Sequence, residues 1–201
     1  MDINDFDLSK LDPEEKEELL ALLEMREDYK KYNKIESFGP YDFQKKFYKA
    51  SKTHKRRFLC AANRIGKSFS EAAEFAWHLT GNYPEGYEGH KFNKPILAWA
   101  VGITGESTQK VLQKELFGTA DARDTKSVGT GSIPKRLIQP DSIARDGQRI
   151  LSAKIKHFNE KGEYDGDSTL EFRSTQQGEH VLMGATVDYI WLDWISESYM
   201  P

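Results

Sequence analysis

The stretch that decides the fold class is FLCAANRIGKS, from Phe58 to Ser68. Its short apolar start predicts a strand, a tight loop follows, and Gly-Lys-Ser opens into a helical pattern from Phe69 to Leu79. Strand, loop and helix in this order are the context of a P-loop, G-x-x-x-x-G-K-[ST], although Ala61 stands at its first glycine. A chance Gly-Lys-Ser turn at a helix start is the alternative.

These residue types suit the phosphates of ATP. Backbone N–H groups of the loop and the following helix would surround the phosphate oxygens, and Gly66 lets the backbone come close. Lys67 would reach the β- and γ-phosphates, and the Ser68 hydroxyl would bind Mg²⁺. Arg64 is either a cation that stabilises the γ-phosphate or a solvated loop charge. The predicted nucleotide-binding residues of the loop are Ala61, Ala62, Asn63, Arg64, Ile65, Gly66, Lys67 and Ser68.

A second apolar run, from Val187 to Leu192, ends at Asp193. Downstream of a P-loop this pattern is typical of a Walker B strand, whose aspartate holds Mg²⁺ directly or through water. An aspartate that caps a following helix is the alternative reading. Ser68 and Asp193 are therefore the predicted metal ligands.

About twenty residues before the P-loop, the sequence FGPYDFQ runs from Phe38 to Gln44. A glutamine in this position could read the adenine edge through its amide, with the aromatic side chains as a stacking wall. The alternative is a helix start whose aromatic residues belong to the core, namely Phe38, Tyr41, Phe43 and Phe47.

Charge is unevenly distributed along the 201 residues, whose net charge is −3. Residues 1–28 hold eleven acidic and three basic side chains, and residues 45–57 hold seven basic side chains and no acidic one. Asp12, Pro13 and Glu15 predict a helix start with a capping box. We expect residues 1–33 to form an acidic helical arm that packs on its own domain, with docking on another subunit as the alternative. The basic stretch either touches a phosphate backbone or is a solvated face.

The remaining pattern predicts one α/β domain over residues 34–201. Apolar runs predict a buried strand at 96–101, a helix over 105–117 and two strands, 150–158 and 169–174, joined as a hairpin. The single cysteine, Cys60, suits a reducing compartment. Without a signal peptide or a long apolar run, the chain is expected in the cytoplasm and not in a membrane.

Taken together, these motifs resemble the ATPase domain of tailed-bacteriophage terminase large subunits, the DNA-packaging motor. The resemblance covers roughly residues 30–193 and rests on FGPYDFQ, on NRIGKS with its internal arginine, on HLTGNYP from His78 to Pro84, and on Gln177 to Asp193. It implies an additional-strand, RecA-like P-loop domain that binds ATP and Mg²⁺. The partners it implies are double-stranded DNA, a terminase small subunit, a portal protein and a homo-oligomeric ring, in the cytoplasm of the host bacterium.

By match, the candidate catalytic residues are Arg64, Lys67 and Asp193. The family carries a water-activating glutamate directly after the Walker B aspartate, whereas this chain has Trp194, and an indole cannot accept that proton. Glu197 is the nearest downstream carboxylate and the fourth candidate. The residues therefore favour nucleotide binding over efficient hydrolysis.

The sequence ends eight residues after Asp193, where the family continues with further strands, one of which lies between the P-loop strand and the Walker B strand. We therefore expect a domain that is incomplete at its C-terminal side, such as a truncated or frame-shifted fragment. Other readings are a helicase-like ATPase, a non-catalytic protein that regulates terminase subunits, and a small P-loop kinase.

Overall fold

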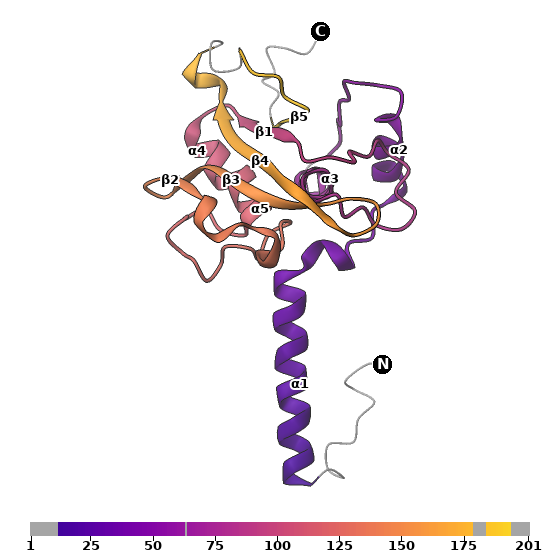
Figure 1. Ribbon diagram of the computed structural model, residues 1–201, viewed down its shortest axis with the longest axis vertical. Helices are drawn as coiled ribbons and strands as arrows, with labels where there is room; N and C mark the ends of the chain where they lie inside the picture. The colour runs from indigo at the N-terminus through magenta and orange to yellow at the C-terminus, as the bar shows by residue number, and fades with distance from the viewer. Residues whose placement is uncertain (1–11, 63, 179–183, 194–201) are drawn as a thin grey trace.

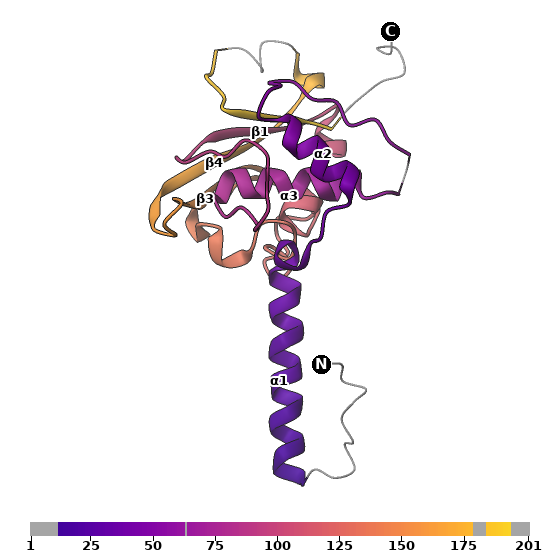
Figure 2. The same ribbon diagram turned by 90° about the vertical axis from the view of Figure 1, so that its right-hand side faces the viewer.

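A mixed sheet with helices packed against it forms the body of the protein (Figures 1 and 2). The computed structural model describes residues 12–62, 64–178 and 184–193. The strand order is β2-β3-β4-β1-β5, in which β1 runs parallel to β4 and β5 while β3 runs antiparallel to β2 and β4. The predicted α/β class is therefore confirmed.

Most elements lie where the patterns predict them. The predicted helix after the P-loop is α3, the buried strand is β1, the hairpin is β3 and β4, and the second apolar run is β5; the three-residue strand β2 was not predicted. The predicted helix over 105–117 forms with a π-helical turn in its middle. The bounds are α1 Pro13–Tyr32, α2 Asp42–Ala50, α3 Lys67–Thr80, β1 Leu97–Gly102, α4 Gly105–Ser107, a π-helical turn Thr108–Gln113, α5 Lys114–Phe117, β2 Ala144–Asp146, β3 Arg149–Phe158, β4 Tyr164–Ser174 and β5 Tyr189–Leu192.

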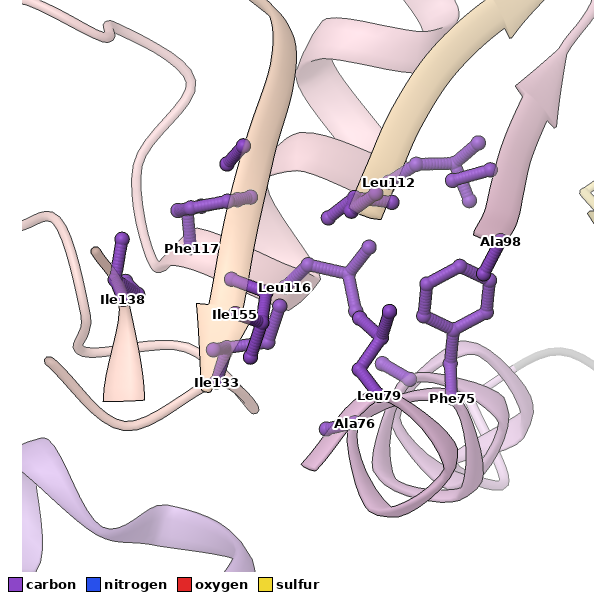
Figure 3. Packing of buried hydrophobic residues seen from close by; sticks show 14 of the residues in the cluster. Phe75, Ala76, Leu79, Ala98, Leu112, Leu116, Phe117, Ile133, Ile138 and Ile155 are labelled. Carbon is purple, nitrogen blue, oxygen red and sulfur yellow. The ribbon is translucent and has the colours of Figure 1, made fainter. Parts of the chain in front are cut away.

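The core lies between α3, the helical segment that ends in α5, and one face of the sheet (Figure 3). Phe75 and Leu79 of α3 pack towards the sheet. Ile155 of β3 and Leu116 of α5 belong to the same cluster, and all four side chains are fully buried. Burial of such side chains contributes roughly 1.5–3 kcal/mol each. This packing fixes the direction of α3 and hence the position of the P-loop at its start.

Gly81 ends α3 in a left-handed conformation with φ of 72°. A Cβ atom here would lie 2.0 Å from the Phe158 carbonyl oxygen and 2.9 Å from His157 Nε2. Only glycine therefore lets the end of the helix approach β3 this closely.

Helix α1 begins at the predicted capping box, but it does not pack on its own domain as expected. Asp12 Oδ1 accepts from the Glu15 N–H at 2.9 Å, and Glu15 Oε2 accepts from the Asp12 N–H at 3.0 Å, which completes the capping box. However, no residue of α1 is buried, and the helix projects from the body in both views (Figures 1 and 2). The expectation that it packs on its own domain is therefore wrong, because polar side chains interrupt its short apolar stripe.

The predicted strand before the P-loop is also wrong. Residues 58–62 pair with no strand in the described part of the chain, and Phe58 is 62% exposed. Within the same described residues, β5 pairs only with β1. A strand needs a neighbour to satisfy its backbone groups, and here none lies beside this short run.

Candidate functional site

The P-loop makes its turn with two residues in the left-handed region. Arg64 has φ of 65° and Gly66 has φ of 81°. Gly66 is also the N-cap residue of α3, and within the described residues no side chain caps this helix. The backbone N–H groups of its first turn therefore keep their capacity to donate, and the helix dipole adds partial positive charge at the same place.

Lys67 folds back over the loop that precedes it. Its ammonium donates to the Ala61 carbonyl oxygen and, at 2.9 Å, to that of Ala62. Ser68 follows at the second position of α3 and is half-buried. The ammonium thus sits over the loop, held by neutral acceptors and by no carboxylate among the described residues. Residues that present free amides, an ammonium and a hydroxyl together fit the triphosphate and magnesium expected from the sequence.

Asp193 lies at the carboxyl end of β5, where its backbone N–H donates to the Val101 carbonyl oxygen at 3.0 Å. Burial raises the pKa of the Asp193 carboxyl, and the Lys67 ammonium acts in the opposite direction. The lysine and the aspartate are thus near enough to interact electrostatically. In the described part of the chain no group of three or more metal-ligating side chains forms. A cation here would take Ser68, Asp193 and phosphate oxygens or water as ligands.

Gln44 lies under the P-loop and is 1% exposed. Its Oε1 accepts from the Tyr41 N–H at 2.7 Å, and its Nε2 donates to the Gly66 carbonyl oxygen at 3.4 Å. Both ends of the amide are therefore already bonded to protein, and the side chain ties α2 to the loop. Adenine recognition by Gln44 stays a prediction.

The remaining predicted site residues divide into two groups. Ala61, Ala62, Arg64 and Ile65 lie on the loop, and the Arg64 residue is exposed. Asn63 and Glu197, together with Trp194, lie outside the described residues.

A network of buried charged and polar side chains lies beside the site, and the sequence did not predict it. Glu74 of α3 is fully buried, and its carboxylate pairs with the Arg57 guanidinium at 3.0 Å. The Tyr87 hydroxyl donates to the same carboxylate at 2.7 Å and the Tyr189 hydroxyl of β5 at 3.5 Å. Arg57 was grouped with the exposed basic stretch, which is wrong, because its side chain is only 10% exposed. An acid directly before large apolar side chains, as in Glu74-Phe75-Ala76-Trp77, was the signal available.

Glu71 is a further carboxylate near the site. It follows Lys67 by one helical turn, and burial, then the charge of Glu74, raises its pKa to about 7, with a smaller contribution from Asp193. Glu71 is therefore a buried carboxyl one helical turn after Lys67, and its pKa depends mainly on burial and on the neighbouring charge of Glu74.

The fold and these contacts define an α/β protein in which a tight loop opens an uncapped helix and Asp193 follows the neighbouring strand β5. A family model described as terminase large subunit, T4likevirus-type, N-terminal, matches residues 58–197. The terminase large subunit of Salmonella phage P22 is 35% identical over 199 residues, which covers 92% of this chain. The chain belongs to the terminase large subunit family, so the resemblance read from its motifs is confirmed.

The chain spans 40% of the length of the phage P22 protein. Among solved structures, the large terminase ATPase domain of Thermus phage P74-26 matches with a TM-score of 0.49 and 16% identity, over 79% of this chain and 55% of that one. In the described residues no helix combines the length and apolar character needed to cross a bilayer.

Proposed function

We propose that this chain binds ATP and Mg²⁺ at the P-loop and is the ATPase portion of a phage DNA-packaging motor. The observation that carries the proposal is the uncapped start of α3, over which the Lys67 ammonium is held by two backbone carbonyl oxygens and by no carboxylate among the described residues. This arrangement occurs in a chain of the terminase large subunit family.

Each residue has a separate task in this proposal. The loop from Ala61 to Ser68 wraps the phosphates, and the Lys67 ammonium leaves its two carbonyl partners to bind the β- and γ-phosphates. Arg64, exposed at the tip of the loop, reaches the γ-phosphate. Ser68 and Asp193 hold the cation, which when bound neutralises part of the phosphate charge. Gln44 positions the loop, and it reads adenine only if its buried amide gives up the long bond to the Gly66 carbonyl oxygen.

Hydrolysis is expected to be slow. Trp194 directly follows Asp193, at the position where the resemblance places a water-activating glutamate. General-base assistance is typically worth about 10²–10⁴ in rate, so binding should survive where turnover does not. Glu197 is the carboxylate that could replace the missing one.

The partners in this proposal are double-stranded DNA, a terminase small subunit and a portal protein, with the motor subunits arranged as a ring in the cytoplasm of the host bacterium. A second proposal gives the chain a regulatory role, in which it joins intact motor subunits without hydrolysing ATP. The tryptophan after Asp193 is the observation that favours it.

The test is calorimetric titration of the protein with Mg·ATP, run beside a phosphate-release assay. We expect Lys67→Ala to weaken ATP binding roughly 10- to 100-fold, because it removes a charge-assisted contact worth about 1.5–3 kcal/mol. Lys154→Ala, which removes an exposed cation from β3, is the matched control and should bind as the parent does. Equal affinity of the parent and Lys67→Ala would overturn the nucleotide site.

Phosphate release separates the two proposals. Turnover at motor-like rates would support the motor role and would require that Glu197 or another acid activates water, which Glu197→Gln would reveal. Tight binding without turnover is the result expected from Trp194 and leaves the choice to a packaging assay: loss of packaging when the chain is added to an intact motor supports the regulatory role, and unchanged packaging contradicts it.

A further inference from the structure

The projecting helix α1 and the basic stretch around α2 are complementary surfaces that the same chain cannot bring together. In both views α1 extends away from the body, while α2 lies on the body (Figures 1 and 2). A helix of 20 residues is about 30 Å long, so the acidic start of α1 lies far from its own α2. From this we infer that α1 of one copy docks on the basic stretch of a second copy.

The geometry of α1 favours a rigid projection. Its last turns are fastened to the body: the Tyr29 hydroxyl donates to Glu36 Oε2 at 2.5 Å, and the Arg136 guanidinium holds the other oxygen of Glu36 at 2.7 Å. The Tyr32 hydroxyl also donates to the Lys126 carbonyl oxygen at 3.0 Å. An isolated helix of this length is only marginally stable in water, so a partner along its exposed length would stabilise it.

The surface that α1 presents is acidic with an uncovered apolar stripe. Glu14, Glu17, Glu18 and Glu24 form no ion pair within the described residues. Leu22, Met25 and Tyr29 follow one another at spacings of three and four and are 55%, 67% and 58% exposed. At about 100° per residue Glu14 and Glu18 lie on the same face as this stripe, so that face offers both apolar contact and negative charge to a partner.

The basic surface carries the opposite charge. Lys45 and Lys49 pair with Asp42 and Glu88, but the other exposed cations of the stretch form no ion pair in the part of the chain that is described. These unpaired cations are Lys46, Lys52, Lys55 and Arg56.

A contact between two different surfaces of the same protein is heterologous, so each copy donates one α1 and accepts another. Such contacts form closed rings or open chains according to the rotation between copies. The contact goes beyond the proposed nucleotide site and requires none of its residues.

The test uses reciprocal charge reversal. One variant carries Glu14→Lys and Glu18→Lys, which lie on the face of the apolar stripe, leave the capping box intact and keep good helix formers. The other carries Lys46→Glu, Lys52→Glu and Lys55→Glu. Sedimentation velocity at about 50 mM salt should show association of the parent, and each variant alone should associate at least about tenfold more weakly because like charges then face one another.

Mixing the two variants should restore association, since the basic α1 of one meets the acidic α2 region of the other. Circular dichroism and thermal melting of each variant show that it folds. Association of either variant alone as strong as that of the parent, a monomeric parent at low salt, or a mixture that stays monomeric would each overturn the contact. Met25→Asp, which charges the apolar stripe without touching the acidic side chains, should weaken the association of the parent.

Discussion

The first turn of α3 leaves its ammonium without a charged partner among the described residues, whereas the middle of the helix buries a carboxylate that is paired within the chain. At the start, Lys67 bonds only neutral carbonyl oxygens, and the N–H groups of the turn have no capping side chain among the described residues. Two turns later, Glu74 is fully buried, and Arg57, Tyr87 and Tyr189 satisfy its carboxylate. Both regions lie on one helix and near one strand, β5.

This difference makes the first turn of α3 a candidate ligand site and the middle of the helix a part of the structural scaffold. A buried charge that is paired within the chain has little left to offer a ligand, and removing its partner leaves it uncompensated. A helix start without a cap gains when an anion arrives. We therefore expect substitutions in the middle of α3 to change stability most, and substitutions at its start to change ligand binding most.

The largest effect should come from Arg57→Ala. This change leaves the Glu74 carboxylate buried without its cation, which typically costs about 3–5 kcal/mol. Burial already raises the pKa of Glu74, while Arg57 opposes that shift. Without Arg57 the folded protein takes up a proton at Glu74 at higher pH, so the loss of stability should be larger at pH 8 than at pH 5. Urea unfolding at both pH values measures it.

The control for Arg57→Ala is Lys110→Ala. Lys110 pairs with Glu106 at 2.5 Å, but both side chains are about two-thirds exposed or more. An exposed pair of this kind contributes about 0–1 kcal/mol. Equal losses from the two variants would contradict the contrast between the middle of α3 and an ordinary surface.

A smaller effect, dependent on pH, is expected at Glu71. Its pKa in the folded protein is about 7, above its ordinary value of 4.5, so the folded state binds the proton more tightly than the unfolded state does. Stability is therefore highest below about pH 4.5 as far as this group is concerned, and falls as the pH rises to about 7. Glu71→Gln should remove this dependence and raise the free energy of unfolding by about 3 kcal/mol at pH 8.

Urea unfolding of parent and variant from pH 5 to pH 8 tests this expectation. Glu85→Gln, at an exposed position, is the control and should leave the profile unchanged. A Glu71→Gln profile parallel to that of the parent would mean that this carboxyl is not the one that titrates.

Local patterns predicted the elements well, since each depends on its own residues. The capping signal at Asp12, the apolar run of β1 and the hairpin of β3 and β4 all form where expected. The family was also readable, because its motifs lie in order along the chain.

The sequence did not predict strand pairing and side-chain burial where these depend on residues that are distant in the chain. The run from Phe58 to Ala62 has the composition of a strand, but whether it pairs is decided by its neighbours in space. Arg57 sits next to exposed cations in sequence, yet it is drawn inward by Glu74, seventeen residues later, and by Tyr189. The predicted roles of Gln44, Ser68 and Asp193 stay predictions, since they concern a ligand.

The smallest effect on stability, and the sharpest test of the helix start, is expected from Gly66→Ala. A Cβ at Gly66 would meet only Gln44 Nε2, at 3.7 Å, which is ordinary contact. The cost to folding is therefore that of a left-handed backbone, about 1 kcal/mol. Gly86→Ala is a matched control, because Gly86 has φ of 76° with open space around it and lies in a surface turn.

The two variants should lose similar stability in thermal melting, but only Gly66→Ala should bind Mg·ATP more weakly than the parent in calorimetry. The added methyl group stands where the backbone must approach phosphate, whereas at Gly86 it meets only solvent. If both variants bound ATP as the parent does, the uncapped start of α3 would not be a phosphate site. The contrast between this turn and the buried Glu74 would then not distinguish a ligand site from the scaffold.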